Sequence, residues 1–116
     1  MKKILIVDDD KDLLYSLTSL FSGKGYKTLT IESGTSVLSL AKIFHPDMIL
    51  LDIKLPDTDG RSVCRKLKDD PGTKMVPIIV TSAVINRTEI KECDASRFLE
   101  KPFDFKTLFS TVESVI

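Results

Sequence analysis

The sequence predicts an α/β fold in which helices cover both faces of a parallel five-stranded sheet. Short apolar runs alternate with amphipathic segments along the whole chain. Most runs are continuously apolar, which is typical of strands that are buried on both faces. Alternation of strands and helices indicates parallel strands joined by helical crossovers. The length of 116 residues suits a single domain over residues 1–116.

The first half of the chain predicts three strands and two helices. Apolar side chains recur at helical spacing from Leu13 to Phe21, and Gly23 ends that helix. The second helix stops before Pro46, because proline cannot continue it. The second strand is more polar than the others, which favours an edge position. In chain order we expect a strand over Ile4–Val7, a helix over Leu13–Phe21, a strand over Lys27–Ile31, a helix over Ser36–Phe44 and a strand over Met48–Leu51.

The second half predicts two further strands and up to three helices. Asp59 and Asp104 each precede an amphipathic segment and are expected to cap it. The segment after Ala83 is short, so we expect a helix of roughly one or two turns there that is mobile or partly unwound. In chain order the expected elements are a helix over Gly60–Leu67, a strand over Val76–Val80, a short helix over Asn86–Glu92, a strand over Arg97–Glu100 and a closing helix after Asp104.

Topology then locates a candidate site. Right-handed crossovers favour a doubly wound sheet with strand order 2-1-3-4-5. Ligands of such sheets bind beyond the carboxyl ends of the strands, between the first and the third. The residues that directly follow each expected strand are therefore the candidate site residues.

Composition excludes several classes of partner. The chain has 17 lysine and arginine residues and 17 aspartate and glutamate residues. It therefore has no net positive charge that would attract nucleic acid or an anionic membrane. The apolar runs are too short to span a bilayer or to form a signal peptide, so the cytoplasm is the expected location. The two cysteines, Cys64 and Cys93, are expected to be reduced, unpaired packing residues.

Carboxylates, a hydroxyl and an ammonium follow the expected strands. They are Asp8 and Asp9 after the first, Asp52 after the third, Ser82 after the fourth and Lys101 after the fifth. Clustered carboxylates repel one another unless a cation lies among them. An all-oxygen site favours Mg²⁺, with Mn²⁺ as an alternative. Asp52 could then attack a phosphoryl group as a carboxylate nucleophile, with Lys101 and Ser82 contacting the phosphate.

Four blocks of sequence resemble the receiver domain of two-component response regulators, a family with a flavodoxin-like fold. Each block alone is weak evidence, but four in order, each at an expected strand end, are specific. The acceptor block has the pattern D-x-x-x-P-x-x-D-G. The blocks are Ile4–Asp9, Asp47–Gly60, Val76–Ala83 and Phe98–Phe103.

The resemblance implies a role for each site residue. It implies that Asp52 accepts a phosphoryl group from a histidine kinase or a histidine phosphotransfer protein. It implies that the chain then switches conformation to control an output domain or partner, and that it catalyses only its own phosphorylation and dephosphorylation. The implied Mg²⁺ ligands are Asp8, Asp9, Asp52 and the backbone carbonyl of Lys54; the implied switch residues are Ser82, Lys101 and Phe98; and the bond between Lys101 and Pro102 is expected to be cis.

Three other kinds of function are alternatives to this interpretation. A haloacid-dehalogenase-type phosphatase needs a second carboxylate two positions after its nucleophile, where this chain has Lys54. A nucleotide binder would want backbone donors after the first strand, where aspartates would repel phosphate. A pseudo-receiver that binds partners without phosphorylation stays open. So do the conformation of residues 84–97 and whether the chain stands alone or is part of a larger regulator.

Overall fold

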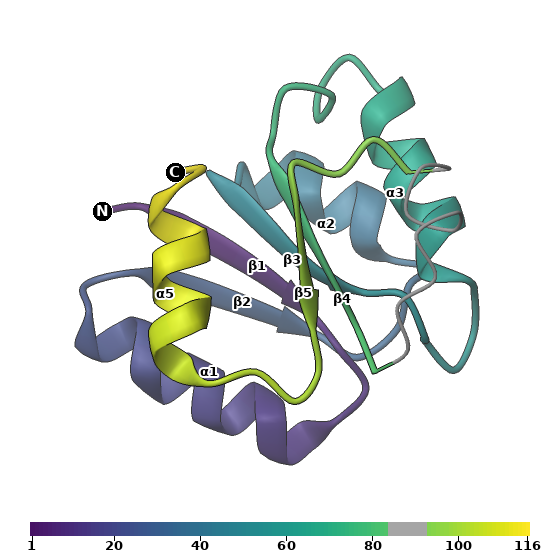
Figure 1. The fold of residues 1–116 in the computed structure, drawn as a ribbon. Coiled ribbons are helices and arrows are strands. Elements are labelled where there is room, and N and C mark those ends of the chain that lie inside the picture. Colours follow the sequence, from purple (N-terminus) through teal and green to yellow (C-terminus); the bar gives the residue numbers. More distant parts are fainter. Residues whose placement is uncertain (84–92) are drawn as a thin grey trace.

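A parallel sheet of five strands in the order β2-β1-β3-β4-β5 forms the centre of the computed structural model (Figure 1). This order confirms the predicted doubly wound topology, with β2 at one edge. Residues 1–83 and 93–116 are described, so the helix expected over 86–92 lies outside the described residues. The elements are β1 Lys3–Val7, α1 Lys11–Gly23, β2 Lys27–Ile31, α2 Val37–Phe44, β3 Met48–Asp52, α3 Gly60–Asp69, β4 Ile78–Ser82, β5 Arg97–Glu100 and α5 Phe105–Glu113.

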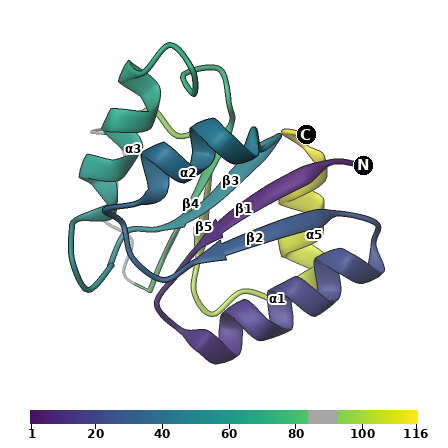
Figure 2. The same ribbon diagram turned by 180° about the vertical axis from the view of Figure 1, so that it is seen from behind.

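Helices lie on both faces of the sheet, with α1 and α5 on one side and α2 and α3 on the other (Figures 1 and 2). Side chains of β1 alternate between the two layers, since successive strand residues point to opposite faces. Ile4 and Ile6 belong to the apolar cluster that includes Phe21 of α1, whereas Leu5 and Val7 belong to the cluster that includes Leu67 of α3. The sheet is thus buried on both faces, and its strand ends become the natural place for polar chemistry.

Aspartates cap three of the described helices, and the caps expected at Asp59 and Asp104 are confirmed. The carboxylate of Asp10 accepts from the amide of Leu13 at 3.1 Å, and the carboxylate of Asp104 accepts from the amide of Thr107 at 2.7 Å. Asp59 caps α3 in the same way. Each cap satisfies an amide that the helix itself leaves without a partner.

Among the helices that the structure describes, none combines the length and apolar character needed to cross a membrane.

The fourth strand begins later than the sequence predicted. Val76–Val80 was expected, but β4 runs from Ile78 to Ser82. Proline has no amide hydrogen, so Pro77 takes part in the sheet only through its carbonyl, which accepts from the amide of Ile49. The shift carries Ser82 into the strand as its last residue.

The two cysteines are joined, so the prediction of unpaired packing residues was wrong. Cys64 of α3 forms a disulfide with Cys93, 29 positions later and shortly before β5, with 5.8 Å between their Cα atoms. Both are buried, as predicted. The pairing depends on how α3 packs against the segment before β5, which sequence separation does not reveal.

Gly60 allows α3 to begin directly against the end of β3. A Cβ atom at this position would lie 2.3 Å from the carbonyl oxygen of Asp52 and 2.6 Å from the Cα of Ile53. We expect Gly60→Ala to lower the free energy of unfolding by about 1–3 kcal/mol, because backbone must move to make room. Urea denaturation would measure this change.

Gly23→Ala provides the matched control. A Cβ at Gly23 would meet nothing within 4 Å. We expect the free energy of unfolding to stay unchanged or to rise by about 0.5–1 kcal/mol, because alanine favours helix. Equal destabilisation by the two substitutions would contradict the close approach at Gly60.

Candidate functional site

The carboxyl ends of four strands bring the predicted polar residues to one place. Asp8 follows β1, Asp52 ends β3, Ser82 ends β4 and Lys101 follows β5. Asp8, Asp52 and Ser82 are buried, with exposed fractions of 3%, 5% and 2%. Burial of two carboxylates so close together is unfavourable unless a cation compensates them.

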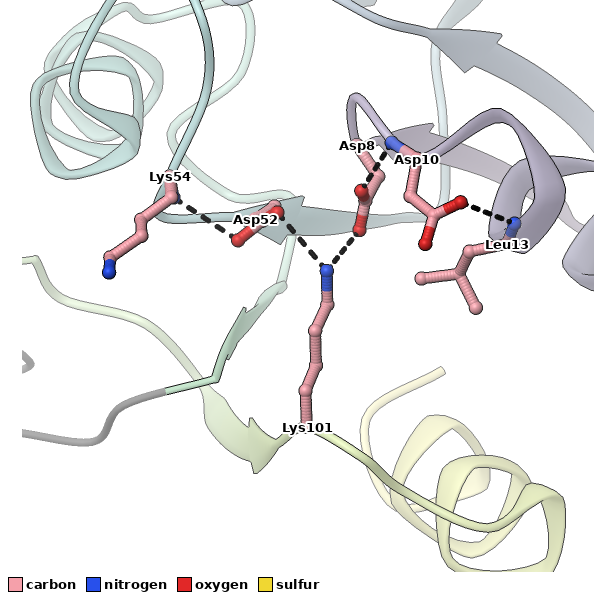
Figure 3. Close-up of polar contacts among 6 residues, drawn as sticks. All are labelled: Asp8, Asp10, Leu13, Asp52, Lys54 and Lys101. Atoms are coloured by element: carbon pink, nitrogen blue, oxygen red, sulfur yellow. Dashed lines mark hydrogen bonds and ion pairs between the residues drawn. The ribbon is translucent and has the colours of Figure 1, made fainter.

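The Lys101 ammonium supplies that compensation. Its Nζ lies 2.6 Å from Oδ2 of Asp8 and 3.1 Å from Oδ2 of Asp52. Figure 3 shows the side chain reaching from the end of β5 to a point between the two carboxylates. One cation therefore joins the ends of β1, β3 and β5.

Backbone amides hold the remaining oxygens of both carboxylates. The amide of Asp10 donates to Oδ1 of Asp8 at 2.9 Å, and the amide of Lys54 donates to Oδ1 of Asp52 at 3.1 Å (Figure 3). The ammonium of Lys54 points away from Asp52. Each carboxylate is thus fixed in orientation by one amide and one ammonium contact.

Burial and the opposite charge of the neighbouring group act in opposite directions on the pKa of Asp52 and on that of Lys101, and both pKa values end above their ordinary ones. Burial raises the pKa of the Asp52 carboxyl above its ordinary 3.8; the Lys101 charge opposes this rise and the Asp8 charge adds to it. Burial alone would lower the pKa of the Lys101 ammonium, but its hydrogen bond to Asp8 and the charges of Asp8 and Asp52 raise it above 10.5. Lys101 therefore stays charged while it stabilises ionised Asp52.

Asp9 completes a group of three carboxylates. One oxygen from each of Asp8, Asp9 and Asp52 can be chosen so that all lie within 4.8 Å of one another. Asp9 is exposed, so the group opens toward solvent on that side. Oxygen donors of this kind fit a hard divalent cation such as Mg²⁺.

The edge formed by β4 and β5 connects to the site through its backbone. The amide of Lys101 donates to the carbonyl of Ser82 at 2.8 Å, and the bond between Lys101 and Pro102 is cis. Phe98, opposite Val80 in the β4–β5 pair, is partly buried against the cluster on the α2 and α3 side. The backbone of Ser82 is thus bonded directly to the backbone that carries the Lys101 side chain.

Asp57 has a structural role that the sequence did not indicate. Its carboxylate accepts from the amides of Gly34 at 2.8 Å and Thr35 at 3.0 Å, which lowers its pKa. These bonds join the loop after β3, which contains Lys54, to the loop after β2. A partner more than twenty positions away leaves no local signal in the sequence.

A pocket of about 330 Å³ opens beside Lys101. Asp10 and Leu13 line it from the start of α1, and Phe103 and Phe105 line it from the segment that begins α5. Its walls are more apolar than the carboxylate cluster next to it. The site therefore combines a charged centre with an adjoining apolar surface.

Comparison with known proteins identifies the family of this chain. The model of the family described as the response regulator receiver domain matches residues 4–113 of the sequence. The chain belongs to the response regulator receiver family. The resemblance noted in the sequence is thereby confirmed, and receiver domains are phosphoacceptor signalling modules of two-component systems.

Relatives of the receiver domain include short and long proteins. The chain is 39% identical to response regulator PleD of Caulobacter vibrioides, over 97% of this chain and 26% of that protein. It is 34% identical to protein PilH of Pseudomonas aeruginosa, over 100% of this chain and 98% of that protein. The chain thus spans about a quarter of one relative and nearly all of another.

Solved structures share the fold over the whole receiver domain. Chemotaxis protein CheY4 of Vibrio cholerae superposes with a TM-score of 0.93 at 26% identity, covering 100% of this chain and 99% of that one. The receiver domain of sensor histidine kinase PA1611 of P. aeruginosa, with a magnesium ion coordinated in its active site cleft, has a TM-score of 0.89 at 25% identity, covering 98% and 96%. The flavodoxin-like arrangement is confirmed by these likenesses.

Lys101→Gln tests the electrostatic balance at Asp52. We expect the pKa of the Asp52 carboxyl to rise further, because the substitution removes the charge that opposes the effect of burial. Carboxyl-carbon NMR titration would follow Asp52 directly. Lys54→Gln removes a charge whose ammonium points away from Asp52 and should leave this pKa near its wild-type value. The same rise in both variants would contradict the specific contact of Lys101.

Proposed function

We propose that residues 1–116 form one receiver domain in which Asp52 accepts a phosphoryl group from a phosphohistidine. The carrying observation is the ammonium of Lys101 between the buried carboxylates of Asp8 and Asp52. Family membership supports phosphoacceptor signalling, and the acceptor role of Asp52 in this chain is our inference from that geometry.

Asp52 is suited to act as the nucleophile. Its Oδ1 is held by the amide of Lys54 and its Oδ2 by Lys101, so the carboxylate has a fixed direction. In the proposed transfer, a bond forms between an Asp52 oxygen and phosphorus as the bond from phosphorus to the donor histidine nitrogen breaks. The nitrogen leaves with the bonding electron pair and takes up a proton. Attack of water on phosphorus then breaks the bond to the Asp52 oxygen, returns the carboxylate and releases inorganic phosphate, which is the self-dephosphorylation expected of such a module.

Asp8, Asp9 and Asp52, with the backbone carbonyl of Lys54, would hold Mg²⁺, and Mn²⁺ fits the same donors. Such an ion offsets negative charge on the carboxylates and on the incoming phosphoryl group. The close approach of the three carboxylates supports this assignment. Lys101 would then leave Asp8 and turn to the phosphate, where its compact charge is needed.

The switch follows from contacts available only after phosphorylation. Phosphorylation adds roughly two negative charges at Asp52. Lys101 and the hydroxyl of Ser82 would bind the new oxygens and shift the β4–β5 edge, with Phe98 moving inward. A shift from mostly off to mostly on needs about 5.5 kcal/mol of differential interaction, which two or three charge-assisted hydrogen bonds can supply.

The apolar pocket beside Lys101 is our candidate for the surface that meets a histidine kinase or phosphotransfer protein. Leu13 and Phe105 offer apolar contacts next to the acceptor, so a partner bound there brings its phosphohistidine close to Asp52. The output partner or domain would read the β4–β5 edge. We expect this exchange in the cytoplasm, where ATP-dependent kinases act.

Acetyl phosphate with Mg²⁺ tests the proposal directly. We expect intact mass spectrometry to show one added phosphoryl group on the wild type and none on Asp52→Asn, because the amide is not a nucleophile for this transfer. Unlabelled wild type would favour the phosphorylation-independent alternative. Equal labelling of both proteins would place the acceptor elsewhere.

Lys101→Met separates metal binding from phosphoryl transfer. Because the ammonium competes with a cation for Asp8 and Asp52, we expect Mg²⁺ affinity to rise by about tenfold or more, roughly 1.4 kcal/mol. Labelling by acetyl phosphate should fall, since the phosphate loses its cation partner. Isothermal titration calorimetry would measure the affinity.

Lys11→Met is the matched control for that measurement, since Lys11 is exposed and pairs with Glu32 at 3.9 Å. Its Mg²⁺ affinity should stay close to that of the wild type. Weaker binding of Mg²⁺ to Lys101→Met than to wild type would contradict the proposed competition.

A further inference from the structure

We propose that Cys64 and Cys93 form a reversible thiol–disulfide pair, and that its oxidation restrains the β4–β5 edge against α3. The first half concerns the covalent state of two side chains alone. The second half rests on the proposed function, because it assumes that this edge moves when Asp52 is phosphorylated.

The two residues are placed for an internal bond. Their Cα atoms are 5.8 Å apart, within the range of about 4.4–6.8 Å that disulfides span. The bond joins the middle of α3 to the segment just before β5, and Figure 1 shows that segment running beside α3. It closes a covalent loop that contains the whole of β4.

Packing ties the pair to the switch region. Cys64 and Cys93 lie in the same apolar cluster as Val80 of β4, and Phe98 of β5 packs against this cluster. The cluster also receives Ala95, whose amide donates to the carbonyl of Cys93 at 2.7 Å. The sulfur atoms therefore lie in the apolar layer behind the proposed switch aromatic.

Backbone bonds carry the restraint onward to the site. One residue after Ala95, the amide of Ser96 donates to the carbonyl of Ile78 at 2.9 Å, where β4 begins. Ser96 directly precedes β5, and β5 leads to Lys101, whose ammonium contacts Asp52. A bond at Cys93 thus fixes the start of the strand whose end supplies the cation of the site.

The chemistry is thiol–disulfide exchange with a low-molecular-weight disulfide. One cysteine thiolate attacks the external disulfide and releases one thiol; the second cysteine then attacks the mixed disulfide and releases the other. Two cysteine thiols are oxidised and one external disulfide is reduced to two thiols, so electrons and protons balance. Burial of Cys64 and Cys93, 0% and 4% exposed, means that local opening must precede the first attack.

Alkylation after redox equilibration tests the pair. The full chain is equilibrated with mixtures of oxidised and reduced glutathione, quenched in acid, unfolded and treated with N-ethylmaleimide before intact mass measurement. We expect two adducts at the reducing end, none on the monomer at the oxidising end, and the same transition from either direction. Two adducts at every ratio, or chain-to-chain dimers and glutathione adducts in place of the internal bond, would overturn the pair.

Thermal unfolding gives a second readout of the same bond. Cross-linking residues 29 apart restricts the unfolded chain, so oxidised wild type should melt roughly 10 °C or more above reduced wild type. The double variant Cys64→Ala, Cys93→Ala should melt at one temperature in both buffers. A wild type with no such difference would contradict the bond.

Amide hydrogen exchange tests the coupling. Beryllofluoride with Mg²⁺, a noncovalent phosphoryl mimic, is added to the oxidised and reduced forms, and exchange is followed over residues 78–82 and 93–103. We expect the change in exchange to be largely lost in the oxidised wild type and retained in the double alanine variant in both buffers. Equal changes in oxidised and reduced wild type would overturn the coupling. No change in either form would overturn the phosphoacceptor function and the coupling with it, while the alkylation result would still decide the redox pair.

Discussion

The ammonium of Lys101 is the contact on which the strand-end site depends. Two carboxylates buried side by side repel each other, and a cation held at 2.6 Å and 3.1 Å makes their shared burial tolerable. In the proposed function, the same cation gives way to a metal ion at Asp8 and moves to a phosphate on Asp52. The side chain of Lys101 thus stabilises the site in the described structure and, under that proposal, also binds the charge that phosphorylation adds.

Precise placement of the carboxylates comes from the backbone. Amides of Asp10 and Lys54 hold the outer oxygens, and both belong to segments fixed by further bonds. Asp57 ties the loop that contains Lys54 to the loop after β2, and Gly60 lets α3 begin against that loop. The orientation of the Asp8 and Asp52 carboxylates is therefore held by turns and helix caps whose own side chains take no part in the proposed chemistry.

The sequence predicted the sheet order and the charged centre because both follow from short-range patterns and one topological rule. Asp8, Asp52 and Lys101 each directly follow or end a strand, so knowing the strands was enough to bring them together. Asp57 and the cysteine pair were not predicted, because their partners are set by how loops and helices pack. The start of β4 was misplaced because Pro77 belongs to the sheet through its carbonyl alone. Long-range packing, unlike periodicity, leaves no pattern among residues that are neighbours in the sequence.

The contact between Asp8 and Lys101 joins residues 93 positions apart, from the first strand to the end of the last. A chain emerging during synthesis has its acidic residues long before it has the lysine that compensates them. Strand β5 must pair with β4 before that lysine can reach Asp52, and closing so long a loop is among the slower events of folding. In the proposed function, the acceptor site is therefore complete only once the last strand is in place.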